Sequence, residues 1–355
     1  MLCALRREVP DRLPASVHQW QEYHRAKYLG GMDSLAAFRH FGLDAAIPCF
    51  PLIDDPSPDW HDEVHHTTSP QGYPLEEHMI YTPGGTLTYK VAVQPTTAWM
   101  TEYLVKRPED VELIDRYMPV PRLDKAAVAR EYDRVGDAGI LRGFVWGWQG
   151  GCWQHAAELY GLRNLILAAK RDPAWVHAFL RVLQKKKLRF IEESLRGARY
   201  DLIETGGGAG SSTCISPRLH AEFCLPYDRE QHAALRTLGL PAVYHTCGGM
   251  MPLLDLIVAN GCAASETLTP PGMGGDADPV ELKRRIGARV ALIGGLNQFQ
   301  VLDGGSHAEI RAEVFRLFQT YGVGGGYICS PSDHFFETPV ENLRAYPQAA
   351  RECRY

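Results

Sequence analysis

The sequence predicts an α/β protein folded as an eight-fold (β/α)8 TIM barrel, and two observations lead to this prediction. From about residue 126 onward, short apolar segments alternate with amphipathic helical segments, the pattern of parallel strands joined by helical crossovers. At least five strand–helix units fit after residue 139, and further units from the N-terminal part would complete a barrel rather than an open sheet. We therefore expect a single domain over residues 1–355.

Residues 1–125 have a different character, because they are rich in proline, glycine and aromatic residues and show no regular alternation. Within them, residues 79–93 predict a β-hairpin, since two β-rich arms flank Pro83-Gly84-Gly85. Residues 107–118 predict a short helix with acidic residues early, where the helix dipole favours them. The cluster "HDEVHH" (61–66) looks like a metal patch, but its polar setting indicates a solvated surface loop.

The repeating part (126–355) can be divided into its elements in order. A helix over 125–137 precedes the strand "GILRGFVWGW", and a long helical stretch (157–196) breaks at "RDPAW". Ser216-Pro217 begins a later helix as a good N-cap and first-turn pair. The remaining strands are predicted in "YDLIETGGG" (200–208), "PAVYHTCGG" (241–249), "CAASETL" (262–268), "RVALIGGLN" (289–297) and "GGYICSPSD" (325–333).

The composition limits the classes of partner. The chain has 355 residues, 22% of them charged, with a net charge of −5 and a pI near 6.3, and its longest basic run is "QKKKLR" (184–189). Nucleic acid is therefore not an expected partner. No apolar run reaches the roughly 18 residues of a membrane span, and the first residues lack a signal-like apolar core. We expect a cytoplasmic protein whose nine cysteines are mostly free thiols.

Polar and thiol side chains recur where the predicted strands end, which is the face of a barrel that carries the active site. His245 and Cys247 lie on one side of an extended segment and can point at one ion. Glu266 ends the next strand, and Cys329 lies on the last one. An imidazole, thiolates and a carboxylate form a suitable zinc shell. The alternatives are that His245 is a hydrogen-bonded strand-end residue and that Cys329 is a buried core thiol.

Other strand-end residues are candidates for catalysis and substrate binding. Glu204 and Asn297 are expected to orient substrate or handle protons, with a hydrogen bond at the barrel rim as the alternative for Glu204. Trp146, Trp148 and Trp153 lie near one strand end. They either line a pocket for a flat or apolar substrate or pack in the core.

Four blocks of the sequence resemble the uroporphyrinogen decarboxylase superfamily. They are "SPRLHAEFCLPYDREQH", "YHTCGGMMPLLDLIVANGC", "DPVELKRRIGARVALIGGLN" and "TPVENLRAYPQAA". The resemblance runs from about residue 108 to the end, and more loosely through "VPDRLP". It implies a (β/α)8 barrel with one of two chemistries. One is cofactor-free decarboxylation of a tetrapyrrole, and the other is zinc-dependent methyl transfer between a corrinoid protein and a thiol or folate.

The resemblance favours the methyltransferase branch. The Arg-Gln-Ala-Gly-Arg signature of the decarboxylases is absent from the corresponding region, "PASVHQWQEYHRAKY". The methyltransferases carry His-x-Cys, matched by His245 and Cys247, and an acidic residue, matched by Glu266. Their last cysteine falls at Ser332 or Asp333 here, so the resemblance leaves Cys329, Asp333 or His334 to complete the metal site.

The function expected from the resemblance is zinc-dependent methyl transfer between a small methylated substrate and a corrinoid (cobalamin). A methoxylated aromatic, undergoing O-demethylation, is one expected donor. The corrinoid is expected on a partner protein, because the chain shows no Asp-x-His-x-x-Gly cobalamin loop. A homodimer is compatible with this expectation. The alternatives are a metal-free decarboxylase or lyase and a non-catalytic, zinc-stabilised binding barrel.

Overall fold

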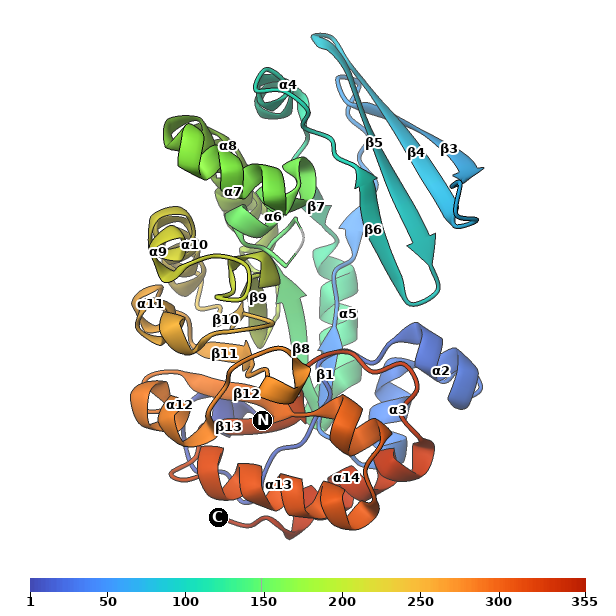
Figure 1. Cartoon of the computed structure of the whole chain (residues 1–355). Helices are drawn as coiled ribbons and strands as arrows, with labels where there is room; N and C mark the ends of the chain where they lie inside the picture. Colours follow the sequence, from blue (N-terminus) through green and yellow to red (C-terminus); the bar gives the residue numbers. More distant parts are fainter. Residues whose placement is uncertain (148) are drawn as a thin grey trace.

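The computed structural model describes residues 1–147 and 149–355, and its centre is a seven-stranded sheet (Figure 1). The strand order is β1-β8-β9-β10-β11-β12-β13, with neighbours parallel throughout. The strands are Ala45–Pro48 (β1), Gly139–Phe144 (β8), Leu202–Gly206 (β9), Ala242–His245 (β10), Ala264–Thr267 (β11), Ala291–Leu296 (β12) and Tyr327–Pro331 (β13). The parallel sheet predicted from the alternating pattern is confirmed.

A segment around Ala15 closes this sheet into a barrel. On one side it pairs with β13: the amide of Cys329 donates to the Pro14 carbonyl, and the amide of Ser16 donates to the Cys329 carbonyl, both at 2.9 Å. On the other side, the amide of Asp44, just before β1, donates to the Ala15 carbonyl at 2.8 Å. The segment thus takes the place of an eighth strand, and the predicted barrel architecture is confirmed.

Helices cover the outside of the barrel, as expected where parallel strands are joined by crossovers. They are Lys125–Val135 (α5), Cys152–Tyr160 (α6), Leu162–Arg171 (α7), Pro173–Phe190 (α8), Pro217–Phe223 (α9), Leu225–Thr237 (α10), Leu254–Ala259 (α11), Pro279–Ile286 (α12), His307–Tyr321 (α13) and Val340–Glu352 (α14). Local sequence sets their starts: the Ser216 side chain caps α9, and Ser306 with Glu309 forms a capping box on α13. The break at "RDPAW" is the start of α8, where Asp172 caps and Pro173 takes the first position.

Two apolar layers hold the barrel together. The inner layer consists of mostly small or branched strand residues such as Ala46, Leu202, Val243 and Ile328. The short helix α1 (Leu2–Leu5) adds to this layer and contacts β12 and β13. The outer layer lies between the strands and the surrounding helices. Strands buried on both faces place their polar side chains at their ends, where the barrel opens.

The N-terminal part adds a four-stranded antiparallel sheet beside the barrel (Figure 1). Its strands are His61–Thr68 (β3), Pro74–Thr82 (β4), Gly85–Gln94 (β5) and Thr97–Glu102 (β6). The predicted hairpin is confirmed as β4 and β5, which turn between Thr82 and Gly85. The placement of "HDEVHH" in a loop is wrong: it forms the edge strand β3, all of whose residues are exposed.

Shorter elements precede β1 or lie between the barrel strands and the antiparallel sheet along the chain. They are Glu22–Tyr28 (α2), Ser34–Phe41 (α3), Leu52–Ile53 (β2), Asp110–Tyr117 (α4) and Arg122–Leu123 (β7), with β2 and β7 pairing antiparallel. The helix predicted over 107–118 is confirmed as α4. Among the residues that the structure describes, none of the helices combines the length and apolar character needed to cross a membrane.

Candidate metal centre

Three adjacent strands bring Glu204, His245 and Glu266 together. His245 is the last residue of β10, and it lies opposite Glu266 of β11 in the parallel register. Nδ1 of His245 is 3.1 Å from Oε1 of Glu266 and 3.7 Å from Oε1 of Glu204, which comes from β9. All three side chains are buried. The structure therefore gathers three of the residues singled out in the sequence into one polar cluster.

A second histidine, which the sequence pattern did not predict as a site residue, completes this cluster. His18 follows the segment that closes the barrel, and its Nδ1 is 3.5 Å from Oε2 of Glu266. One donor atom from each of His18, Glu204, His245 and Glu266 lies within 4.8 Å of all the others. One sequence feature could have identified His18 as a site residue: it lies in the block where the decarboxylase signature is missing.

Arg142 of β8 neutralises the two carboxylates. Its Nη2 is 3.0 Å from Oε2 of Glu204, and 2.7 and 2.9 Å from the two oxygens of Glu266. Its Nη1 lies 3.2 Å from Nδ1 of His18. Buried charges are tolerated when they are paired and hydrogen-bonded in this way. Arg142 thus fixes the orientation of both glutamates.

The ionisation of the cluster follows from these contacts. Burial opposes the charge on Glu266, but the charges of Arg142 and His18 hold the pKa of this carboxyl well below its usual range. Burial also disfavours a charged His245, but its hydrogen bonds to Cys247 and Glu266 raise the pKa of the imidazole well above the usual value. Binding of a cation would require the imidazole of His245 to lose its proton.

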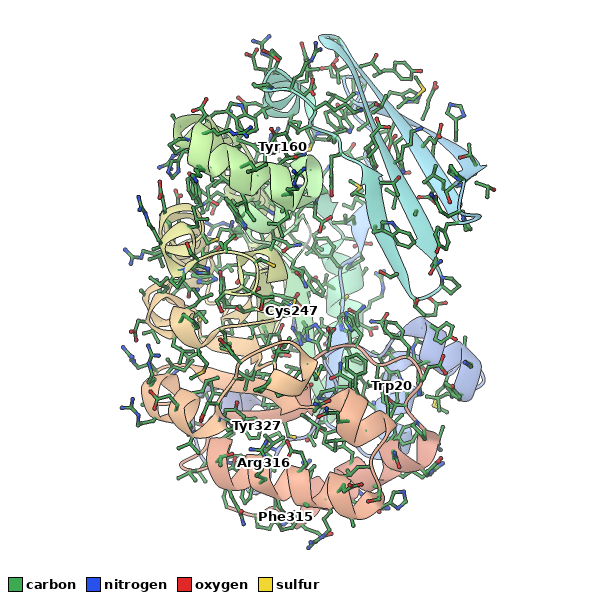
Figure 2. All side chains as sticks on the ribbon, in the orientation of Figure 1. Trp20, Tyr160, Cys247, Phe315, Arg316 and Tyr327 are labelled. Atoms are coloured by element: carbon green, nitrogen blue, oxygen red, sulfur yellow. The ribbon has the colours of Figure 1, made fainter. Side chains whose placement is uncertain are left out.

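Cys247, labelled near the middle of the molecule in Figure 2, lies two residues beyond His245 and its thiol forms a hydrogen bond with that imidazole. It is half-buried. A glycine opposite makes room for its thiol, because a Cβ added at Gly208 would lie 2.5 Å from Sγ of Cys247. The glycines after β9 therefore accommodate this side chain. The sequence predicted that the strand over 200–208 ends in glycines, but it did not show why glycines are needed there.

The three candidates for a further ligand lie in different environments. The structure places Cys329 away from the cluster: it lies in the outer apolar layer beside Tyr327 and Tyr346, and burial raises the pKa of its thiol to about 12. Asp333 is exposed, and its carboxylate accepts a hydrogen bond from the amide of His334. The ring of His334 lies 5.4 Å from the ring of His18.

His334 is the candidate nearest the cluster. Within the part of the chain that the structure describes, its buried Nδ1 has no hydrogen-bond partner. Burial and the nearby His18 lower the pKa of its imidazole to about 4, which keeps it neutral and free to donate a lone pair. Cys329, by contrast, faces outward with Tyr327, while Ile328 between them faces the barrel interior.

The remaining predicted site residues are dispersed. Asn297 caps the helical turn Gln298–Asp303 by accepting from the amide of Gln300 at 3.0 Å. Trp153 is buried in α6, packs on Phe223 and donates its indole N–H to the Ala209 carbonyl, so it belongs to the core. Trp146 lines a cavity beside the N-terminal sheet. Trp148 lies outside the described residues.

The donor set fits a divalent metal ion such as zinc. Two imidazoles and two carboxylates are typical zinc ligands, and a thiol stands next to one of the imidazoles. The cluster also has the hydrogen-bonded outer partner that such sites use, because Arg142 holds both carboxylates.

Fold and site together define a barrel enzyme with a polar centre at the strand ends. The chain belongs to the uroporphyrinogen decarboxylase (URO-D) family, whose sequence pattern matches residues 80–353. It is 27% identical over 203 residues to the methylated-thiol–coenzyme M methyltransferase of Methanosarcina mazei, a match that covers 56% of this chain but only 50% of that protein. It is 22% identical over 352 residues to a uroporphyrinogen decarboxylase of Coxiella burnetii, covering 96% of this chain and 86% of that one.

A solved structure supports the fold over the whole chain. A methyltransferase from Methanosarcina mazei superposes with a TM-score of 0.66 at 16% identity, covering 99% of this chain and 97% of that one. At this level of identity the similarity establishes the fold alone.

Proposed function

We propose that this protein is a zinc-dependent methyltransferase that moves a methyl group between a small methylated substrate and a corrinoid carried by a partner protein. The observation that carries the proposal is the buried cluster of His18, Glu204, His245 and Glu266, with Cys247 beside it. The similarity to a methyltransferase named for methylated thiols supports the same class. A methoxylated aromatic is the first donor class that we would test.

The residues divide into ligands and supports. His245, Glu266 and Cys247 are the proposed ligands, with His18 or His334 in place of the missing family cysteine. When bound, zinc would act as a Lewis acid on the oxygen or sulfur of the methylated substrate. Arg142 holds the carboxylates in place. The corrinoid would approach over the open end of the barrel on a separate protein, since the ligands lie at the strand ends.

A metal-free decarboxylase is the second candidate, because decarboxylase relatives match over most of the chain. A site for a tetrapyrrole with many carboxylates would need several cationic groups at the barrel mouth. Among the described residues, Arg142 is the buried arginine near the strand ends of the barrel. Its guanidinium already forms ion pairs with Glu204 and Glu266, so it is not free to bind a substrate carboxylate. This arrangement favours the methyltransferase.

Metal content tests the proposal first. We expect about one zinc per chain by elemental mass spectrometry of protein purified without chelator. Cys247→Ala should lose methyl transfer to cob(I)alamin from the active donor while keeping a native circular dichroism spectrum. Cys214→Ala, another half-buried cysteine, is the matched control and should keep both metal and activity.

Each class predicts a different outcome. Metal-free wild-type protein that decarboxylates a porphyrinogen would replace the proposal with the decarboxylase. Unfolding on removal of zinc by a chelator, without methyl transfer from any donor, would indicate a zinc-stabilised binding barrel.

A further inference from the structure

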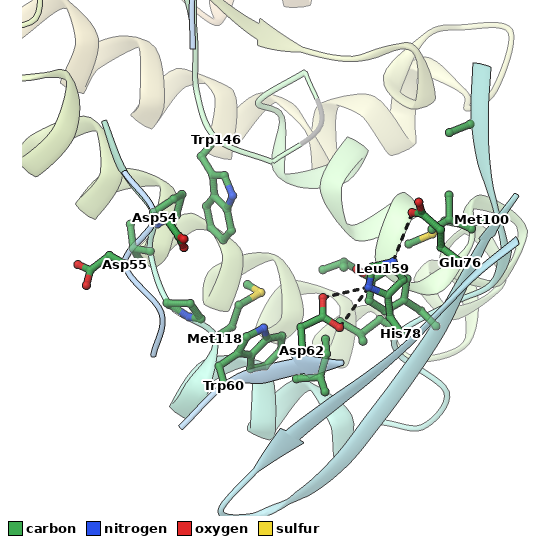
Figure 3. Close-up of a pocket in the computed structure, with 18 of the residues that line it drawn as sticks. Asp54, Asp55, Trp60, Asp62, Glu76, His78, Met100, Met118, Trp146 and Leu159 are labelled. Atoms are coloured by element: carbon green, nitrogen blue, oxygen red, sulfur yellow. Dashed lines mark hydrogen bonds and ion pairs between the residues drawn. The ribbon is translucent and has the colours of Figure 1, made fainter. Parts of the chain in front are cut away.

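A large cavity lies between the four-stranded sheet and the rim of the barrel (Figure 3). It measures about 650 Å³, within the range of small-molecule sites. One wall is the face of β3–β6 that bears Asp62, His78 and Tyr89. The opposite wall includes Trp146, which follows β8, and Leu159 of α6. The cavity is therefore distinct from the buried histidine–glutamate cluster, and none of its lining residues belongs to that cluster.

Aromatic and apolar side chains form most of the cavity wall. Trp60, Tyr89 and Trp146 contribute their rings, and Ile80 and Met100 are among the aliphatic residues. Figure 3 shows the Trp60 and Trp146 side chains in the middle of the cavity wall, between two groups of carboxylates. Faces of tryptophan and tyrosine rings attract cations as well as apolar groups.

The charged residues of the cavity are almost all acidic. Asp54 and Asp55 lie at one end, and Asp62 and Glu76 lie at the other (Figure 3). Among the described lining residues there is no lysine and no arginine. The lining thus carries four carboxylates and one imidazole, that of His78, so acidic groups outnumber basic ones.

His78 organises one of the two acidic ends. Its Nδ1 lies 3.1 and 3.0 Å from the two oxygens of Asp62, and its Nε2 lies 3.7 Å from Oε2 of Glu76. Its ring stacks on Tyr89 with centroids 4.1 Å apart. Both carboxylates remain about one-third exposed. They are thus held in position while still accessible to a ligand.

We propose that this cavity binds a small organic cation with an apolar or aromatic body, such as a substituted ammonium compound. The rings would enclose the apolar body and the methyl groups of the cation, and the carboxylates would supply the opposite charge. The same charges disfavour an aromatic carboxylate. Binding in this cavity requires neither the metal nor methyl transfer, so it goes beyond the function proposed above.

The test compares ligands of equal shape and different charge. Phenyltrimethylammonium and its neutral isostere tert-butylbenzene are titrated into the full chain by calorimetry, with 4-tert-butylbenzoate as the anion. We expect the cation to bind at least about tenfold more tightly than the neutral isostere, and the anion most weakly. The affinity for the cation should fall as salt is added.

Variants locate the binding site. Asp62→Asn with Glu76→Gln removes two negative charges at nearly constant shape and should weaken the cation about tenfold or more, without changing the affinity for the neutral isostere. Glu63→Gln is the control. Glu63 is next to Asp62 on β3, is exposed and does not line the cavity, so this variant should bind the cation as wild type does.

Three results would overturn the proposal. The first is equal affinity for the cation and its neutral isostere. The second is no binding of the cation up to about 10 mM. The third is an unchanged affinity for the cation in the double variant. If the double variant does not fold, Trp60→Leu provides the second test and should weaken the cation. A failure here would leave the proposed methyltransferase intact, because zinc content and methyl transfer are measured separately.

Discussion

The guanidinium of Arg142 contacts both carboxylate oxygens of Glu266, at 2.7 and 2.9 Å, inside a region closed to solvent. Because a buried carboxylate without a partner is costly, each partner depends on the other. This pair ties β8 to β11 across the open end of the barrel. It also sets the orientation of the glutamate that is a proposed metal ligand.

Removal of this arginine should destabilise the fold. Arg142→Met leaves two buried glutamates without their cation, so we expect the free energy of unfolding to fall by about 3–5 kcal/mol. Urea denaturation measures the change. Arg316→Met, which removes a surface pair with Glu313, is the control and should change stability by less than about 1 kcal/mol. Equal effects of the two substitutions would contradict the assigned role of the buried pair.

Cys329, which the sequence predicted as a ligand, and His18, which the structure places in the cluster, should behave differently on substitution. Cys329→Ala removes a buried side chain from the outer layer, so we expect it to cost about 1–2 kcal/mol of stability and to leave zinc content unchanged. His18→Ala removes a member of the cluster and should lower zinc content. Elemental mass spectrometry of both variants gives the answer. Loss of zinc from Cys329→Ala alone would restore that cysteine as a ligand.

Asp228 should give stability a pH dependence of its own. Burial raises the pKa of this carboxyl to about 7, and Tyr244 donates a hydrogen bond to it at 2.8 Å. Between about pH 4 and pH 7 the folded state holds a proton that the unfolded state has lost, so this group makes stability fall as pH rises and adds nothing further above pH 7. The total effect is on the order of 4 kcal/mol.

Comparison with a variant isolates this effect. Relative to wild type, Asp228→Asn should gain stability steadily from about pH 4 to pH 7 in urea denaturation. Asp255→Asn, at an exposed position paired with Arg285, should show a constant difference over the same range. A constant difference for Asp228→Asn would show that this carboxyl ionises as an ordinary surface group does.

The tryptophans should separate stability from substrate binding. Trp153→Phe loses a buried hydrogen bond to the Ala209 carbonyl, so we expect about 1–2 kcal/mol less stability and an unchanged KM for the methyl donor. Trp146→Leu changes the wall of the cavity and should affect binding of the phenyltrimethylammonium cation more than stability. A raised KM in Trp153→Phe at unchanged stability would reverse these assignments.

Most of the barrel could be predicted from the sequence, because each parallel strand is a short apolar run followed by an amphipathic helix. The same property explains the misplaced cysteine. A strand buried on both faces is apolar at every position, so the sequence does not reveal which of Ile328 and Cys329 faces inward. His245 and Glu266 were recognised because they are polar side chains at strand ends.

The parts that could not be predicted lack periodicity. His18 lies in an irregular segment and reaches Glu266 only through the closure of the barrel. The edge strand β3 is exposed at every residue, so no alternation of apolar and polar side chains marks it. The acidic cavity depends on the packing of this sheet against the barrel, which no local pattern encodes.

The bridge between Ala15 and Cys329 has a consequence for the order of events during biosynthesis. The two residues stand near opposite ends of the sequence, so the ring of strands cannot be completed until nearly the whole chain has left the ribosome. Until then the segment around Ala15 has no β13 to pair with, and an unpaired strand edge is a hazard for aggregation that chaperones can limit. Because His18 directly follows the closing segment, its position beside Glu266 is fixed on both sides only after β13 has paired with that segment.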